Sequence, residues 1–262
     1  MLNVGSSSRA FAGFDFPIGL PESYGISTGL SGFREVLTSA GRLSGWERFF
    51  DVADVPGDIQ LSRPFYPRSS KKGVSRASLW GALGVSSFED LLRECERGGP
   101  GRREACSIFW TLGGNQVGRA AAAGWQEIVR PALEQGARLW PFDGTLPALS
   151  QTNGLVLAET YPADAYAVVG APFSSRESKT SQTHRASKAE AILAWAKVKA
   201  VDLSAVEPVL TDGFGVSKSG EDPFDALLGL LAMIAVVDGD LQEATATLKS
   251  EKARWEGWIL GR

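Results

Sequence analysis

Two apolar runs in the sequence predict strands that end in acidic residues. Residues 9–16 (RAFAGFDF) form a short apolar run that reaches Asp15 and then meets a stretch rich in proline and glycine, which interrupts strands. Residues 154–162 (GLVLAETYP) are continuously apolar up to Glu159, a pattern typical of a strand covered on both faces, as in a parallel sheet. We therefore expect two strands that each deliver a carboxylate to their carboxyl end.

The region between these runs has the spacing of short amphipathic helices. Serines precede three periodic stretches, at Ser31 (GFREVL), Ser44 (GWERFF) and Ser87 (FEDLLREC), and Glu47 would close a capping box on Ser44. A later helix is predicted to stop at Gly136, before a short strand and turn in ARLWPFDG. This middle section is therefore predicted to be helical.

After the second predicted strand, the rest of the chain is predicted to be mainly helical. Helices are predicted at about 182–200, near 204–211, and from Pro223 to about Val237. Strands alternating with helices indicate an α/β fold. We expect a single domain, 1–262, with a largely helical insertion at about 25–135.

Composition limits the classes of partner. The hydrophobic fraction of 44% is ample for a packed core, while 27 basic against 30 acidic residues give a formal charge of −3, so that only a local basic patch could bind a polyanion. The chain carries no signal-peptide pattern and no apolar run of about 20 residues, which predicts a cytoplasmic protein without a membrane partner. Cys95 and Cys106 lack the spacing of a zinc or redox motif. The oligomeric state stays open.

Three groups of acids are candidates for chemistry. Asp15 and Glu159 end strands, where open α/β sheets place their ligands; the alternative is that each caps the turn or helix that follows. In GEDPFDALLGLLAMIAV, Asp222 is predicted as N-cap and Asp225 as the third residue of a helix, and capping alone would explain both. Together, however, two strand-end acids and acids on a helix start suit a pair of Mg²⁺ or Mn²⁺ ions about 4 Å apart.

Several long motifs, in the same order, resemble one family. These are FDFPIGLP, RPFYP, FWTLGGNQVGRAAAAGW, LWPFDG, AETYPADAY and DGFG…GEDPFDALLGLLAMIAV. The chain resembles, from about residue 10 to its carboxyl terminus, the RNase H-like predicted nucleases of domain-of-unknown-function family 429. The resemblance implies an α/β fold with an RNase H-like mixed sheet flanked by helices. It also implies that Asp15, Glu159 and Asp225 are catalytic, and that they and Asp222 bind Mg²⁺ or Mn²⁺.

The sequence departs from this family at its start. RNase H-like folds normally open with a strand that carries the first metal-binding aspartate, whereas no acidic residue precedes Asp15 here. We interpret this as a chain that begins late, because losing the central strand would leave its neighbours without hydrogen-bonding partners.

Basic residues near these acids are candidates for contacts with a phosphate backbone. Four of them lie before or on the helix after Glu159: Arg176, Lys179, Arg185 and Lys188. A solvated helix face is an equally good explanation for them. A second candidate is the basic segment 62–76, with Arg63, Arg68, Lys71, Lys72 and Arg76.

These observations favour a metal-dependent nuclease or phosphodiesterase that acts on nucleic acid. The alternative is a non-catalytic RNase H-like binding or regulatory protein with a degenerate metal site. A third hypothesis, an actin-like ATPase, rests only on the glycine-rich stretch 113–118. A Ser-His-Asp mechanism is disfavoured, because His184 is the only histidine and no nucleophile elbow is near it.

Overall fold

The structure, a computed structural model, describes residues 8–66, 76–98, 104–111, 116–216, 220–244 and 252–262. The chain divides into two compact units. Unit 1 comprises Met1–Glu159 and Ala244–Ile259, and unit 2 comprises Thr160–Glu243 and Leu260–Arg262. In the described ranges, no helix has the length and apolar character needed to cross a membrane.

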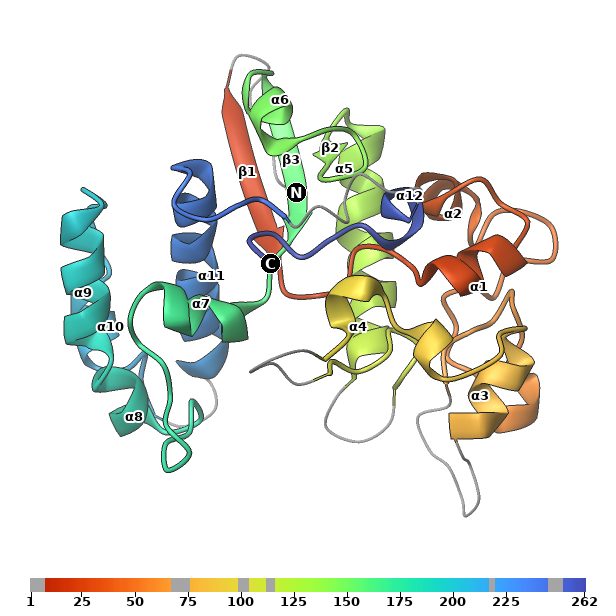
Figure 1. Cartoon of the computed structure of the whole chain (residues 1–262), viewed down its shortest axis with the longest axis horizontal. Coiled ribbons are helices and arrows are strands. Elements are labelled where there is room, and N and C mark those ends of the chain that lie inside the picture. Colours follow the sequence, from red (N-terminus) through yellow and green to blue (C-terminus); the bar gives the residue numbers. More distant parts are fainter. Residues whose placement is uncertain (1–7, 67–75, 99–103, 112–115, 217–219, 245–251) are drawn as a thin grey trace. The chain divides into compact units, whose positions relative to one another are not determined.

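Unit 1 contains a parallel sheet of three strands in the order β1-β3-β2 (Figure 1). The strands are β1 (Arg9–Phe14), β2 (Arg138–Leu139) and β3 (Gly154–Glu159). The central strand β3 is buried from Leu155 to Glu159, which confirms the inference from its continuous apolar run. The mixed sheet that we expected is not what the described residues form: every connection between these strands passes through helices, so each strand returns in the same direction.

The described parts of the chain between β1 and β2 form short helices joined by turns and loops. The α-helices are α1 (Glu22–Ser27), α2 (Phe33–Ser39), α3 (Arg76–Ala82), α4 (Val117–Gly124) and α5 (Arg130–Glu134), with single turns η1 (Pro56–Asp58), η2 (Glu89–Leu91) and η3 (Glu94–Glu96) and a π-helical turn η4 (Trp125–Val129). The helix predicted to stop at Gly136 does so, because Gly136 adopts φ +88° and the amide of Ala137 bonds back to the carbonyl of Ala132. Helices α6 (Leu146–Ser150) and α12 (Ala253–Glu256) complete unit 1.

Two of the predicted helix starts were wrong. Residues after Ser44 form successive turns, and the Glu47 carboxylate accepts the amide of Gly45 rather than closing a capping box. After Ser87 there are two separate 3₁₀ turns instead of one helix, and Asp90 accepts the amide of Ser87. In both places the acid satisfies nearby amides in a turn, which competes with helix formation.

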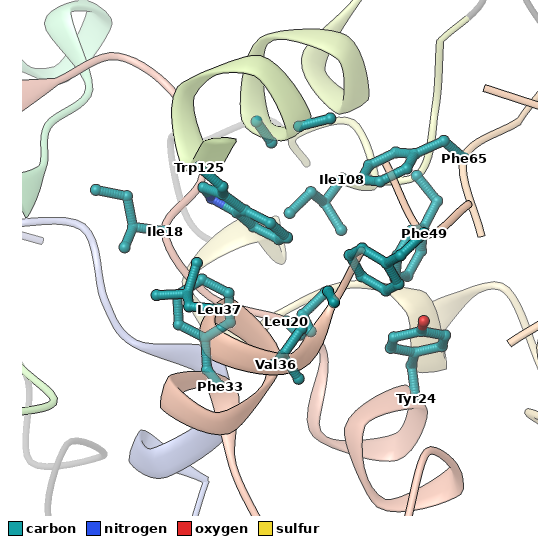
Figure 2. Packing of buried hydrophobic residues seen from close by; sticks show 14 of the residues in the cluster. Ile18, Leu20, Tyr24, Phe33, Val36, Leu37, Phe49, Phe65, Ile108 and Trp125 are labelled. Carbon is teal, nitrogen blue, oxygen red and sulfur yellow. The ribbon is translucent and has the colours of Figure 1, made fainter. Parts of the chain in front are cut away.

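The core of unit 1 is rich in aromatic side chains. In this core, α2 packs against the π-helical turn η4, which begins at Trp125. Figure 2 shows the Trp125 ring facing Phe33 and Leu37 of α2, and the centroids of the Trp125 and Phe33 rings are 4.9 Å apart. The indole N–H of Trp125 donates to the carbonyl of Pro17 at 2.8 Å, so that this buried polar group is satisfied. Ile18 and Leu20, which follow β1, belong to the same core.

Unit 2 is helical in its described residues. Its helices are α7 (Pro162–Val168), α8 (Gln182–Ala186), α9 (Ala189–Val198), α10 (Glu207–Thr211) and α11 (Glu221–Val237). The helix predicted at 182–200 is interrupted, because the amide of Lys188 bonds to the carbonyl of Arg185 in a tighter turn. Helix α7 packs along α11 (Figure 1), and Phe224, Leu228 and Leu231 of α11 lie in the core of this unit.

The start of α11 differs from the prediction by two residues. Gly220 is the N-cap, so Asp222 is the second residue of the helix and Asp225 is the fifth. Asp222 is exposed and still faces the positive end of the helix dipole, whereas Asp225 lies beyond the first turn and is buried. Capping therefore does not explain the position of Asp225.

Candidate carboxylate site

The two strand-end acids of unit 1 lie at the same edge of the sheet, as the sequence predicted. Strands β1 and β3 run parallel in a register that pairs Phe14 with Glu159, and Asp15 is the next residue after Phe14. Asp15 is exposed, while Glu159 is only 4% exposed. The two carboxylates thus occupy neighbouring positions in very different environments.

The Glu159 carboxylate is held by a buried guanidinium. Arg93, which is fully buried, donates to both Glu159 oxygens at 2.7 Å each. The amide of Ile18 donates to Glu159 Oε2 at 2.6 Å. A bidentate guanidinium and a backbone amide occupy the same oxygens that a metal ion would need.

Arg93 is the centre of a wider buried network. Its Nε donates to Glu96 at 2.9 Å and its Nη1 to the backbone carbonyl of Glu256 at 3.1 Å. Burial raises the pKa of Glu96, and the charge of Arg93 opposes that shift. The Glu256 carboxylate accepts the amide of Glu94 at 2.6 Å. This network connects η3, the end of β3 and α12 within unit 1.

The sequence interpretation missed Arg93 and its two neighbouring acids. We assigned FEDLLREC to an amphipathic helix, in which a charged residue such as Arg93 would lie on the solvent face. The sequence offered one indication that Arg93 is buried, because it directly follows the two apolar residues Leu91 and Leu92. Both leucines are buried in the structure. The partner Glu159, however, lies 66 residues away in the chain.

In unit 2, Asp225 also has a cation beside it. Lys179 Nζ lies 2.7 Å from the Asp225 carboxylate and 2.9 Å from that of Glu221, and the hydroxyl of Tyr166 donates to Asp225. Burial lowers the pKa of Lys179, but its hydrogen bonds to Asp225 and Glu221 outweigh this and raise the pKa overall. Glu221, one turn before Asp225, is a member of this cluster that the sequence interpretation did not select.

The four basic residues assigned to phosphate contact differ widely in their surroundings. Arg185 is fully buried and donates to the backbone carbonyls of Lys179, Gly213 and Gly215 at 2.6–2.9 Å, which makes it a structural residue of unit 2. Lys188 pairs with Glu177 at 2.8 Å, and this hydrogen bond, together with those from Ser174, lowers the pKa of Glu177 to about 2. Lys179 holds Asp225 and Glu221. Arg176 is exposed.

The other basic candidates are only partly described. Arg63 is 3% exposed, pairs with Asp54 at 2.9 Å and donates to the carbonyl of Val52, so it stabilises its own loop. Arg68, Lys71, Lys72 and the side chain of Arg76 lie outside the described residues, as do residues 113–115 of the glycine-rich stretch.

A groove of about 510 Å³ lies between α2 and α5 of unit 1. Its lining residues are Arg34, Glu35, Leu37, Thr38, Arg130, Leu133 and Glu134. None of the acids or bases that the sequence selected is among them.

The comparisons with known proteins add no further restriction. The chain matches no protein-family model, no curated protein and no solved structure. Within the described ranges, no group of three His, Cys, Asp or Glu side chains is placed to hold a metal ion. The chemistry open to these acids therefore depends on the contacts that each of them makes.

The two acids that are paired with cations differ in how firmly they are held. Breaking a buried pair such as Arg93–Glu159 leaves an uncompensated buried charge, which costs about 3–5 kcal/mol. The Lys179 side chain is 42% exposed, whereas that of Asp225 is 10% exposed, so solvent screens this pair in part. Glu159 is therefore held more firmly by Arg93 than Asp225 is by Lys179.

Proposed function

We propose that this chain is a metal-dependent phosphodiesterase or nuclease of the RNase H-like type. The observation that carries the proposal is the parallel pairing of β1 and β3, which places Asp15 at the carboxyl edge of the sheet, where α/β enzymes bind their ligands. The order of motifs that resemble those of the RNase H-like predicted nucleases suggests the same reaction class.

As ligands for Mg²⁺ or Mn²⁺ we propose Asp15 within unit 1 and, separately, Asp222 and Asp225 within unit 2. Bound divalent ions would supply an activated water and stabilise the negative charge that develops on the phosphate. Within this chain, Tyr166 and Lys179 hold the Asp225 carboxylate in one orientation.

The test is cleavage of nucleic acid by the full chain. Purified protein is incubated with DNA, RNA and a small chromogenic phosphodiester, in Mn²⁺, Mg²⁺ or chelator. We expect metal-dependent cleavage that falls at least about 100-fold in Asp15→Asn and Asp225→Asn, because metal sites depend steeply on their carboxylates. Asp51→Asn, an exposed aspartate of unit 1 paired with Arg48, serves as the matched control and should retain activity. Full activity of Asp225→Asn would refute the proposal.

A second candidate is a non-catalytic binding or regulatory protein with a degenerate metal site. It is favoured by the cations that already neutralise Glu159 and Asp225, namely Arg93 and Lys179. Titration calorimetry with Mn²⁺ separates the two candidates. Binding at micromolar Mn²⁺ supports the enzyme, and the absence of heat at millimolar Mn²⁺ supports the degenerate site.

A further inference from the structure

We propose that Glu159 and Arg93 are positioning residues, which hold the turn that carries Asp15, and that Glu159 is not itself a metal ligand. The proposal rests on the function proposed above, because it concerns how that site is built. It assigns to the strand-end glutamate a role that differs from the one implied by the family resemblance.

Glu159 contacts the chain on both sides of Asp15. Its backbone is paired with Phe14, the residue before Asp15, in the β1–β3 ladder. Its side chain accepts the amide of Ile18, three residues after Asp15, at 2.6 Å. A single residue of the central strand therefore fixes the start and the end of the turn, and this restricts where the Asp15 backbone can lie.

Arg93 determines the orientation of the Glu159 side chain. The guanidinium binds both carboxylate oxygens, and its other contacts, to Glu96 and to the carbonyl of Glu256, prevent it from rotating away. Guanidinium and carboxylate groups bonded through two parallel hydrogen bonds have one favoured geometry. The side chain of Glu159 is thus directed toward Ile18 and is not available to a cation at the surface.

The far side of the same turn is packed too closely to move. The amide of Leu20 donates to the carbonyl of Trp255 at 2.7 Å. A Cβ atom on Gly19 would lie 2.0 Å from the carbonyl oxygen of Glu256, and one on Gly257 would lie 2.4 Å from that of Ile18. The backbones of residues 18–20 and 255–257 therefore cross in direct contact, and the turn after Asp15 is fixed from this side as well.

The first experiment measures the turn itself, without metal. Amide hydrogen exchange is recorded on the full chain for wild type and Glu159→Gln, a variant of nearly equal shape without the charge. We expect the Ile18 amide to exchange about tenfold faster or more in the variant, because a hydrogen bond to a charged acceptor is lost. The Trp140 amide, which donates to Leu157 in the same unit, is the control and should keep its protection. Equal protection of Ile18 in both proteins would overturn the proposal, as would a uniform loss across unit 1.

The second experiment distinguishes positioning from ligation through Mn²⁺ affinity. If Glu159 were a ligand masked by its partner, Arg93→Met would release the carboxylate and tighten Mn²⁺ binding, and Glu159→Gln would abolish it. For a positioning pair, neither variant tightens binding, Glu159→Gln keeps the Mn²⁺ stoichiometry, and Asp15→Asn loses affinity most. Tighter binding in Arg93→Met overturns the proposal. If wild type binds no Mn²⁺, the proposed function fails, and the exchange of Ile18 still decides whether Glu159 holds the turn.

Discussion

Removing the Arg93 side chain tests whether the buried network stabilises unit 1. In Arg93→Met, the apolar stem is kept, but four side-chain hydrogen bonds disappear: one to Glu96, two to Glu159 and one to the carbonyl of Glu256. Two carboxylates that are less than 5% exposed lose their counter-ion. We expect a loss of about 3–5 kcal/mol, the usual effect of leaving a buried charge unpaired. This is a large part of a typical unfolding free energy of about 5–15 kcal/mol.

Arg42→Met is the matched control for this prediction. Arg42 and Glu134 also lie 2.7 Å apart, but both side chains are more than half exposed. Solvent screens such a pair, so the expected loss is below about 1 kcal/mol. The shortest arginine–carboxylate distance is the same in both cases, whereas burial and the number of hydrogen bonds differ.

Urea unfolding monitored by tryptophan fluorescence measures both variants, since Trp125, Trp140 and Trp255 are buried in unit 1. Because the chain has two compact units, the transition is also followed by circular dichroism to check that both probes coincide. If Arg93→Met loses no more stability than Arg42→Met, the buried network does not stabilise the fold and the reasoning is refuted.

Two further predictions concern the backbone and the pH dependence. Gly19→Ala should destabilise the protein by about 1–3 kcal/mol more than Gly136→Ala in thermal unfolding. Both glycines have positive φ, but only Gly19 lacks space for a Cβ atom. Equal effects would show that the backbone contact between Gly19 and Glu256 can relax. The folded-state pKa of Glu177 is about 2, below its ordinary value of 4.5, because Lys188 and Ser174 both hydrogen-bond to the carboxylate. These interactions stabilise the fold above pH 4.5, and their contribution disappears as the pH falls toward 2. The difference in melting temperature between wild type and Glu177→Gln should therefore shrink from pH 6 to pH 2, and a constant difference would contradict the assignment.

The sequence by itself determined the elements whose signals are local. The apolar run before Asp15 and the run before Glu159 are strands, the helix stops at Gly136, and the apolar helix predicted from Pro223 ends at Val237. These features depend on hydrogen bonds and side-chain spacing within a few residues, which periodicity records directly. The same local information failed after Ser44 and Ser87, where acids bind turn amides instead of capping helices.

Only the tertiary structure decided what surrounds each acid. Arg93 and Glu159 are 66 residues apart, and Lys179 and Asp225 are 46 apart, so no local pattern records either pairing. Arg185 has the sequence context of an exposed helical residue, yet its guanidinium is buried among backbone carbonyls. The sequence placed Asp15 and Glu159 at the same edge correctly because parallel strands end together. It could not show that one of them is exposed and the other is held by a buried arginine, since burial and charge pairing arise only when distant segments pack.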